Sequence, residues 1–269
     1  SQGVLAWLVS TASGEALSPA AVHQLPLVAN PDSIIRTESM RVLGTIFTKA
    51  ADRKFDILRK MGMNIVSHFL RTVKKHFEEG SEEERLAGMG ALADFSIIST
   101  ETLQLVLEGS TAVSGLQGTA LLDAWMELLV NSKAEIVSAL LQSVAFILSR
   151  EDAKFLTGTE SGERDHVVAL KRQLVSRIGQ ARRTTTVAFL VKLATQPVEA
   201  TRYAAINLMR ALADQQSGWG LQLLFAHAQA ATPDENFYLY LQERLTEYCK
   251  EGKDWKFSLI TSVWQCSAK

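Results

Sequence analysis

The sequence predicts an all-α protein built from stacked helical repeats, and three observations carry this prediction. Glycine and proline are scarce, at 16 and 5 residues among 269. Apolar residues recur at the spacing of one-sided helices. A pattern of a long helix, a shorter helix and a glycine returns along the chain. Together these favour a helical solenoid over a sheet protein.

The scarcity of proline is strongest in the middle of the chain. No proline occurs between Pro31 and Pro197. A sheet protein of this length needs many tight turns, and turns draw heavily on proline and glycine. The composition therefore favours helices.

Apolar periodicity predicts individual helices. Leu43 and its neighbours give one example, in which the apolar face at i, i+4, i+7, i+8 and i+11 consists of Ile35, Ser39, Val42, Leu43 and Ile46. Trp125, within LLDAWMELL, lies on a similar stripe and is expected in the core.

Self-similarity sets the architecture. MRVLGTIF leads to FDILRKMG, GALADFS leads to LQLVLEG, and SVAFILSR leads to AKFLTG, closing at Gly62, Gly109 and Gly158. These glycines are 47 and 49 residues apart, a period typical of armadillo or HEAT repeats. We expect one armadillo/HEAT-like superhelical domain over residues 1–269. Its abrupt apolar start at Val4 and Leu5 suggests a fragment of a longer repeat protein.

In such repeats the helix before the short one forms the inner, concave wall. The expected wall helices are Ile34–Thr48, Glu83–Ile98, Ala134–Ser149 and Glu199–Ala213. Their outward side chains are the candidate partner-binding residues: Arg41, Thr45, Asp94, Gln142, Tyr203, Asn207 and Arg210.

The last of these helices gives the sharpest candidate face. Tyr203, Asn207 and Arg210 are spaced i, i+4 and i+7, which places them on one side, whereas Ala205 and Leu208 point toward neighbouring repeats. Tyrosine and arginine are frequent interface anchors. The alternative is that Tyr203 is packed between helices.

Charge and cysteine content limit the partners. The formal net charge is -1, so nucleic acid and anionic membranes find no general attraction. The only cysteines, Cys249 and Cys266, lack a disulfide framework, which predicts a cytoplasmic or nuclear protein. No uncharged stretch has the ~18 apolar residues of a membrane helix.

The remaining charged groups are interpreted as solvated surface. An acidic run comprises Glu78, Glu79, Glu82, Glu83 and Glu84, and a basic cluster comprises Lys171, Arg172, Arg177, Arg182 and Arg183. Both fall between repeats and are expected mainly on loops and helix faces, with a partner contact as the alternative. The histidines, His23, His68, His76, His166 and His227, are expected at the surface or half-buried.

No residue pattern indicates catalysis. His68 and His76 are eight residues apart, too far to share one metal ion without a third ligand. Gly88, Gly90 and Ala93 have the outline of a dinucleotide loop, but a helical segment rather than a strand precedes them. We expect no enzyme activity, cofactor, metal or small-molecule substrate.

Two segments resemble a known family. TTVAFLVKLATQPVEATRYAAINLMRALADQQSGWGLQLLF contains Gln196-Pro197 before the helix of Ala204-Ala205, and KEGKDWKFSLITSV has Lys253-Asp254 before an aromatic-led helix. Both resemble the C-terminal half of the 26S proteasome non-ATPase regulatory subunit 5 family. Weaker similarity extends the match over roughly residues 35 to 263.

The resemblance implies a non-catalytic chaperone for assembly of the proteasome regulatory particle. Family members bind the C-terminal domain of a proteasomal AAA ATPase subunit, which would be the protein partner here. The alternative is another armadillo/HEAT scaffold of the nuclear-transport or phosphatase-adaptor type. Transport proteins repeat Trp and Asn on their inner helices, whereas this chain has Arg41, Thr45, Gly90 and Asp94.

Overall fold

A computed structural model describes residues 2–14, 32–53, 57–109, 118–150, 161–181, 186–195 and 197–214. All regular structure in these ranges is α-helical, which confirms the predicted fold class. The helices are α1 (Gln2–Ser13), α2 (Ser33–Asp52), α3 (Ile57–Met61), α4 (Met63–Glu79), α5 (Glu82–Ser96), α6 (Thr100–Glu108), α7 (Ala120–Asn131), α8 (Ala134–Ser149), α10 (Ser161–Ala181), α11 (Thr186–Ala194) and α12 (Glu199–Asp214).

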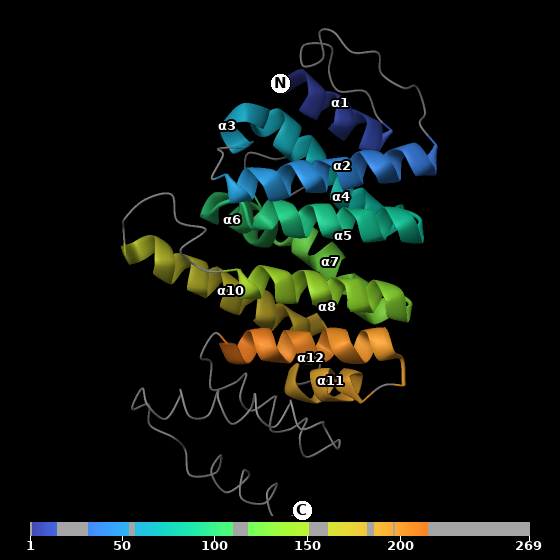
Figure 1. Ribbon diagram of the computed structural model, residues 1–269, viewed down its shortest axis with the longest axis vertical. Helices are drawn as coiled ribbons and strands as arrows, with labels where there is room; N and C mark the ends of the chain where they lie inside the picture. Colours follow the sequence, from blue (N-terminus) through green and yellow to red (C-terminus); the bar gives the residue numbers. More distant parts are fainter. Residues whose placement is uncertain are drawn as a thin grey trace, which may run out of the picture.

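Helices α2, α5, α8 and α12 lie side by side in one layer, and we call their outward surface the wall (Figure 1). Helices α4, α7 and α10 belong to a second layer behind them. The predicted wall helices are thus found with nearly the predicted bounds. The prediction of one domain over 1–269 includes residues 215–269, which lie outside the described part, and it stays a prediction.

Side-chain contacts fix the register between neighbouring wall helices. The Ser33 and Ser81 hydroxyls are 3.4 Å apart, and Arg36 donates to Glu84 over 2.6 Å, each pair separated by 48 residues in sequence. Helices α2 and α5 therefore run parallel, with their first turns side by side. This 48-residue offset is the repeat that the sequence predicted.

We call the contact between two neighbouring wall helices a seam. The other two seams of the wall have different offsets in residue number. The Lys133 ammonium donates to Glu82 over 2.7 Å, an offset of 51 residues between α5 and α8. The Ser138 and Thr201 hydroxyls are 2.8 Å apart, an offset of 63 residues between α8 and α12. The wall helices are thus parallel throughout, and longer connections separate the later ones.

Local capping explains where several helices begin and end. Ser81 and Glu84 form a reciprocal capping box at the start of α5. Gly62 follows α3 with φ of 77°, and Gly109 follows α6 with φ of 70°, a region that favours glycine. The closing glycines are confirmed at these two positions, whereas Gly158 lies outside the described residues.

The core runs continuously between the layers. Phe47, Phe69 and Phe95, from α2, α4 and α5, are fully buried, with ring centroids 5.0 to 5.2 Å apart. Trp125 is also fully buried, as predicted. Leu5 is buried in α1.

Three members of the predicted apolar face of α2 are confirmed, since Ser39 and Leu43 are buried and Ile46 is half-buried, but the other two are wrong. Ile35 and Val42 are 40% and 45% exposed, whereas the buried side contains Met40 and Phe47 beside Leu43. Helix α2 lies between α1 and α5, and it meets α5 through Gly44, where the two backbones approach closely. Gly44 has no apolar side chain, so the hydrophobic pattern did not mark the side of α2 that faces α5.

Candidate functional site

The seven candidate residues all lie on the wall helices. Arg41, Thr45, Gln142, Tyr203 and Asn207 are exposed, and Asp94 and Arg210 are half-buried. Tyr203 is 54% exposed, which excludes the alternative that it is packed between helices. Ala205 and Leu208 are fully buried, as predicted.

The register brings these residues to common levels across the wall. The offsets of 48, 51 and 63 residues place Arg41, Gly90, Gln142 and Tyr203 within about two residues of one level. Two residues along a helix span only about 3 Å. The wall therefore presents a row of residues from four helices, in which α2, α8 and α12 contribute side chains and α5 contributes the bare backbone of Gly90.

A second row lies one turn further along the helices. It contains Thr45, Asp94, Phe146 and Asn207, by the same offsets. Phe146 is 40% exposed and was not among the predicted residues. Phe146 follows Gln142 by four residues and therefore lies on the same outward side of α8, which is the sequence signal that could have identified it.

The electrostatic settings of the wall residues differ. Arg41 forms an exposed ion pair with Glu38. The Arg202 guanidinium lies 5.6 Å from the centroid of the Tyr203 ring. Burial raises the pKa of Asp94, and a hydrogen bond from Thr48 only partly opposes this shift.

Several charged groups expected in solvent are instead structural. Glu84 is buried at the end of the acidic run, where it accepts from Arg36 and closes the capping box. Lys171 of the basic cluster is also buried and donates to the carbonyls of Leu148 and Arg150 at 3.2 and 2.6 Å. It satisfies carbonyls at the C-terminal end of α8, which would otherwise have no helical partner.

Two other members of the acidic run and the basic cluster form ion pairs with residues outside them. Arg177 pairs with Asp123, and Glu78 accepts from Lys74 over 2.5 Å. Arg182 and Arg183 lie outside the described residues.

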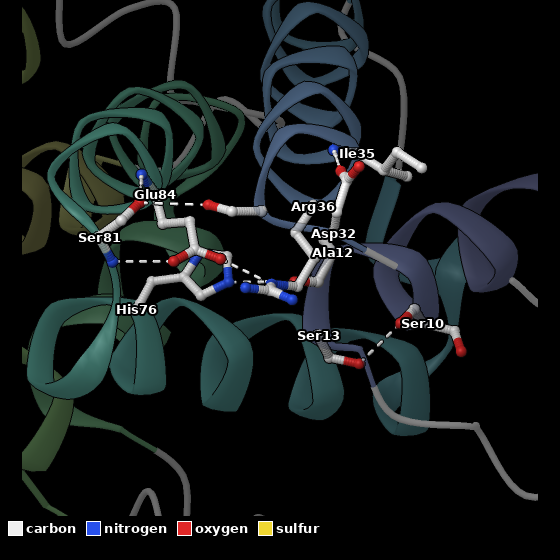
Figure 2. A network of polar contacts seen from close by, with 10 residues as sticks. Ser10, Ala12, Ser13, Asp32, Ile35, Arg36, His76, Ser81 and Glu84 are labelled. Atoms are coloured by element: carbon white, nitrogen blue, oxygen red, sulfur yellow. Dashed lines mark hydrogen bonds and ion pairs between the residues drawn. The ribbon is translucent and has the colours of Figure 1, made fainter. Parts of the chain in front are cut away.

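Two histidines are also buried, against expectation. His68 Nε2 is 2.9 Å from the Ser13 hydroxyl, and His76 Nε2 donates to the Ala12 carbonyl over 3.0 Å. Figure 2 shows His76 beside Arg36 and Glu84, where α1, α2, α4 and α5 meet. These histidines bind the end of α1, which explains their burial.

The other candidates for chemistry gave no site. His166 is exposed, whereas His23, His227 and both cysteines fall outside the described residues. Gly88 and Gly90 lie within α5, so the dinucleotide-loop outline is part of a helix. Among the described side chains, no group of three His, Cys, Asp or Glu residues could hold a metal ion. None of the described helices is both long and apolar enough to cross a bilayer.

Comparison with known proteins gave matches to solved structures. No protein-family model matches the chain, and neither does any curated protein. An engineered protein of the Northeast Structural Genomics Consortium is 18% identical with a TM-score of 0.49, covering 92% of this chain and 97% of its own. A designed armadillo repeat protein in complex with the peptide (KR)4 is 15% identical with a TM-score of 0.47, covering 91% and 99%. A second designed armadillo repeat protein, also 15% identical, has a TM-score of 0.45 with the same coverage.

Proposed function

We propose that this protein is a non-catalytic scaffold that holds a protein partner on the wall. The observation that carries this proposal is the exposed row from four parallel helices, with Tyr203 at its end. Side chains at common levels on adjacent helices form an extended surface, which suits a folded protein domain better than a small substrate. Tyr203 and Arg41 are of the types that most often anchor such interfaces.

The partner we propose is the C-terminal domain of a proteasomal ATPase subunit, bound during assembly of the regulatory particle. The resemblance of residues 185–225 and 250–263 to the proteasome non-ATPase regulatory subunit 5 family supports this finer proposal. Within the first segment, α12 begins two residues after Pro197, and Ala204 and Ala205 are fully buried. The resembling segment therefore supplies both the packing face and the exposed face of one wall helix.

The test is a binding series with the C-terminal domain of each proteasomal ATPase subunit. One of these domains should bind the full chain, whereas the mature 26S particle should not. Tyr203→Ala and Arg210→Ala should each weaken that complex by ~1–3 kcal/mol. Arg71→Ala is the matched control, because Arg71 is exposed on α4 in the second layer.

Thermal melts on the same variants separate binding from folding. Tyr203→Ala should shift the free energy of unfolding by less than about 0.5 kcal/mol, since the side chain is exposed. Equal recovery of the mature particle would contradict the assembly role. If Tyr203→Ala and Arg210→Ala bind as tightly as Arg71→Ala, the wall is not the partner surface.

A further inference from the structure

Among the described carboxylates of the wall helices that are buried or half-buried, Asp94 differs from the others in lacking a lysine or arginine partner. Glu38 pairs with Arg41, Glu82 with Lys133, and Glu84 with Arg36. In the part of the chain that the structure describes, Asp94 has a hydrogen bond from Thr48 but no lysine or arginine partner. A negative charge thus lies in the second row with no cation beside it.

Partial burial makes this arrangement costly. Asp94 is half-buried, and removal from water disfavours its charged form, which raises the pKa of the carboxyl group. Glu83 and Glu135 are also on wall helices but are exposed, so their charges remain solvated. A half-buried carboxylate gains more from an added cation than a solvated one does, because water screens it less.

Two glycines shape the space around Asp94. A Cβ atom on Gly44 would lie 3.0 Å from Asp94 Oδ2, so the bare backbone of α2 makes room for the carboxylate. Gly90 lies one turn earlier on α5, and a Cβ atom there would meet no atom within 4 Å. The surface of α5 one turn before Asp94 is therefore open backbone.

We propose that Asp94 is an anchor site for one lysine or arginine side chain of the partner, whose aliphatic stem crosses the open backbone at Gly90. This inference rests on the proposed function, since it takes the wall as the partner surface. Phe146 lies at the same level on the next helix and offers exposed aromatic surface to the same side chain. One carboxylate selects a single basic anchor, not an extended basic peptide.

The first experiment compares Asp94→Asn with Glu135→Gln in the full chain. Against the ATPase domain that binds, Asp94→Asn should lose affinity roughly tenfold or more and flatten the salt dependence of binding. Glu135→Gln should change affinity less than about twofold, because an exposed charge contributes little. The melting temperature of Asp94→Asn should stay level or rise, since a half-buried charge is removed.

A second experiment needs no natural partner. The probe is acetyl-Gly-Arg-Gly-amide, titrated into the isotopically labelled full chain, with acetyl-Gly-Glu-Gly-amide as the matched control. The arginine peptide should shift the amide resonances of residues 90–94 with a Kd in the range of ~1–10 mM. Asp94→Asn should abolish those shifts, and the glutamate peptide should not produce them.

Failure of this inference can be told from failure of the proposed function. If Tyr203→Ala weakens the complex but Asp94→Asn does not, the wall binds a partner without this anchor. If the arginine peptide shifts no resonance near Asp94, or shifts it equally in Asp94→Asn, the anchor site is refuted. If the peptide binds at Asp94 but no ATPase domain binds the chain, the anchor stands and the proteasomal partner is wrong.

Discussion

The seam between α2 and α5 and the seam between α8 and α12 join parallel wall helices by different chemistry. In the first, Arg36 and Glu84 form an ion pair of 2.6 Å, and Gly44 lets the backbones approach closely. In the second, Ser138 and Thr201 face each other at 2.8 Å, both buried. One seam therefore uses a charge pair and a glycine, and the other uses two neutral hydroxyls.

The comparison shows that close packing of the wall helices requires small residues, whereas it allows either a charged or a neutral polar contact. Both seams place small residues in contact across the two helices: Gly44 against Ala91 in one, and Ser138 against Thr201 in the other. Close approach of two helices needs small residues, whereas the polar contact beside it can be charged or neutral. Charge should therefore make only the first seam sensitive to pH.

The largest expected effects come from the cores behind the two seams. Phe47→Ala removes one of three clustered rings and should cost ~3–5 kcal/mol of unfolding free energy. Leu208→Ala behind the second seam should cost ~2–5 kcal/mol, because it also leaves a buried cavity. Denaturant unfolding gives both values.

Hydrogen exchange on the same variants tests whether the seams are independent. In a repeat protein each repeat contacts mainly its neighbours. Phe47→Ala should speed amide exchange in α2, α4 and α5 more than in α8 and α12. Equal acceleration throughout would mean that the two seams unfold as one unit.

Gly44→Ala tests the close approach in the first seam. The added methyl would lie 3.3 Å from the Ala91 Cα as well as close to Asp94, so overpacking should cost ~1–3 kcal/mol. Gly90→Ala is the matched control, since that methyl enters open space within the same layer. It should stabilise the protein by ~0.5–1 kcal/mol through a better helix propensity. Melts in which both variants behave alike would contradict the close contact.

Acid should weaken the first seam in two steps. Burial lowers the pKa of His76, so this side chain is neutral in the fold and its protonation opposes folding as the pH falls below about 6.5. Burial alone would raise the pKa of Glu84, but the Ser81 backbone N–H and Arg36 outweigh it and lower the pKa. The stability that Glu84 supplies is therefore present above its unfolded pKa, about 4.5, and is lost as the pH falls through the folded value.

Glu84→Gln isolates the second step. It should cost ~1–3 kcal/mol at pH 7, because it weakens a largely buried ion pair and one side of a capping box. The difference from wild type should shrink as the pH falls below the unfolded pKa of about 4.5 and through the lower folded value. A gap that persists unchanged in acid would show that the carboxylate charge is not the source of the stability.

Much of the wall could be predicted because helices in a solenoid follow local rules. Helix α8 has the predicted bounds, Ala134–Ser149, and α12 differs by one residue at its end. Tyr203 and Asn207 of α12 are exposed as predicted, because they share a phase that points away from the buried Ala205 and Leu208. Arg210, predicted on the same side, is half-buried.

Besides the apolar face of α2, the errors concern polar groups whose partners lie on other helices. His76 binds a carbonyl 64 residues away, Glu84 an arginine 48 away, and Lys171 carbonyls 21 and 23 away. Composition predicts such residues in solvent, since isolated charges are costly to bury. Only the tertiary structure supplies the partners that make their burial possible.

The smallest expected effect belongs to the hydroxyl pair of the second seam. The Ser138 hydroxyl lies 2.7 Å from the Ala134 carbonyl and the Thr201 hydroxyl 3.4 Å from it, so the shorter contact favours Ser138 as the donor to this carbonyl and Thr201 as the donor to Ser138. Ser138→Ala leaves the Thr201 hydroxyl with only the Ala134 carbonyl at 3.4 Å, and should cost ~1–2 kcal/mol. Thr201→Val leaves the Ser138 donor satisfied and should cost ~0.5–1 kcal/mol.

The double variant should lose less than the two single losses combined, because no buried donor then lacks an acceptor. Denaturant unfolding of the four proteins at pH 7 and pH 4 gives the coupling, which should be the same at both pH values. Additive losses, or a coupling that changes with pH, would contradict a neutral hydroxyl contact in this seam.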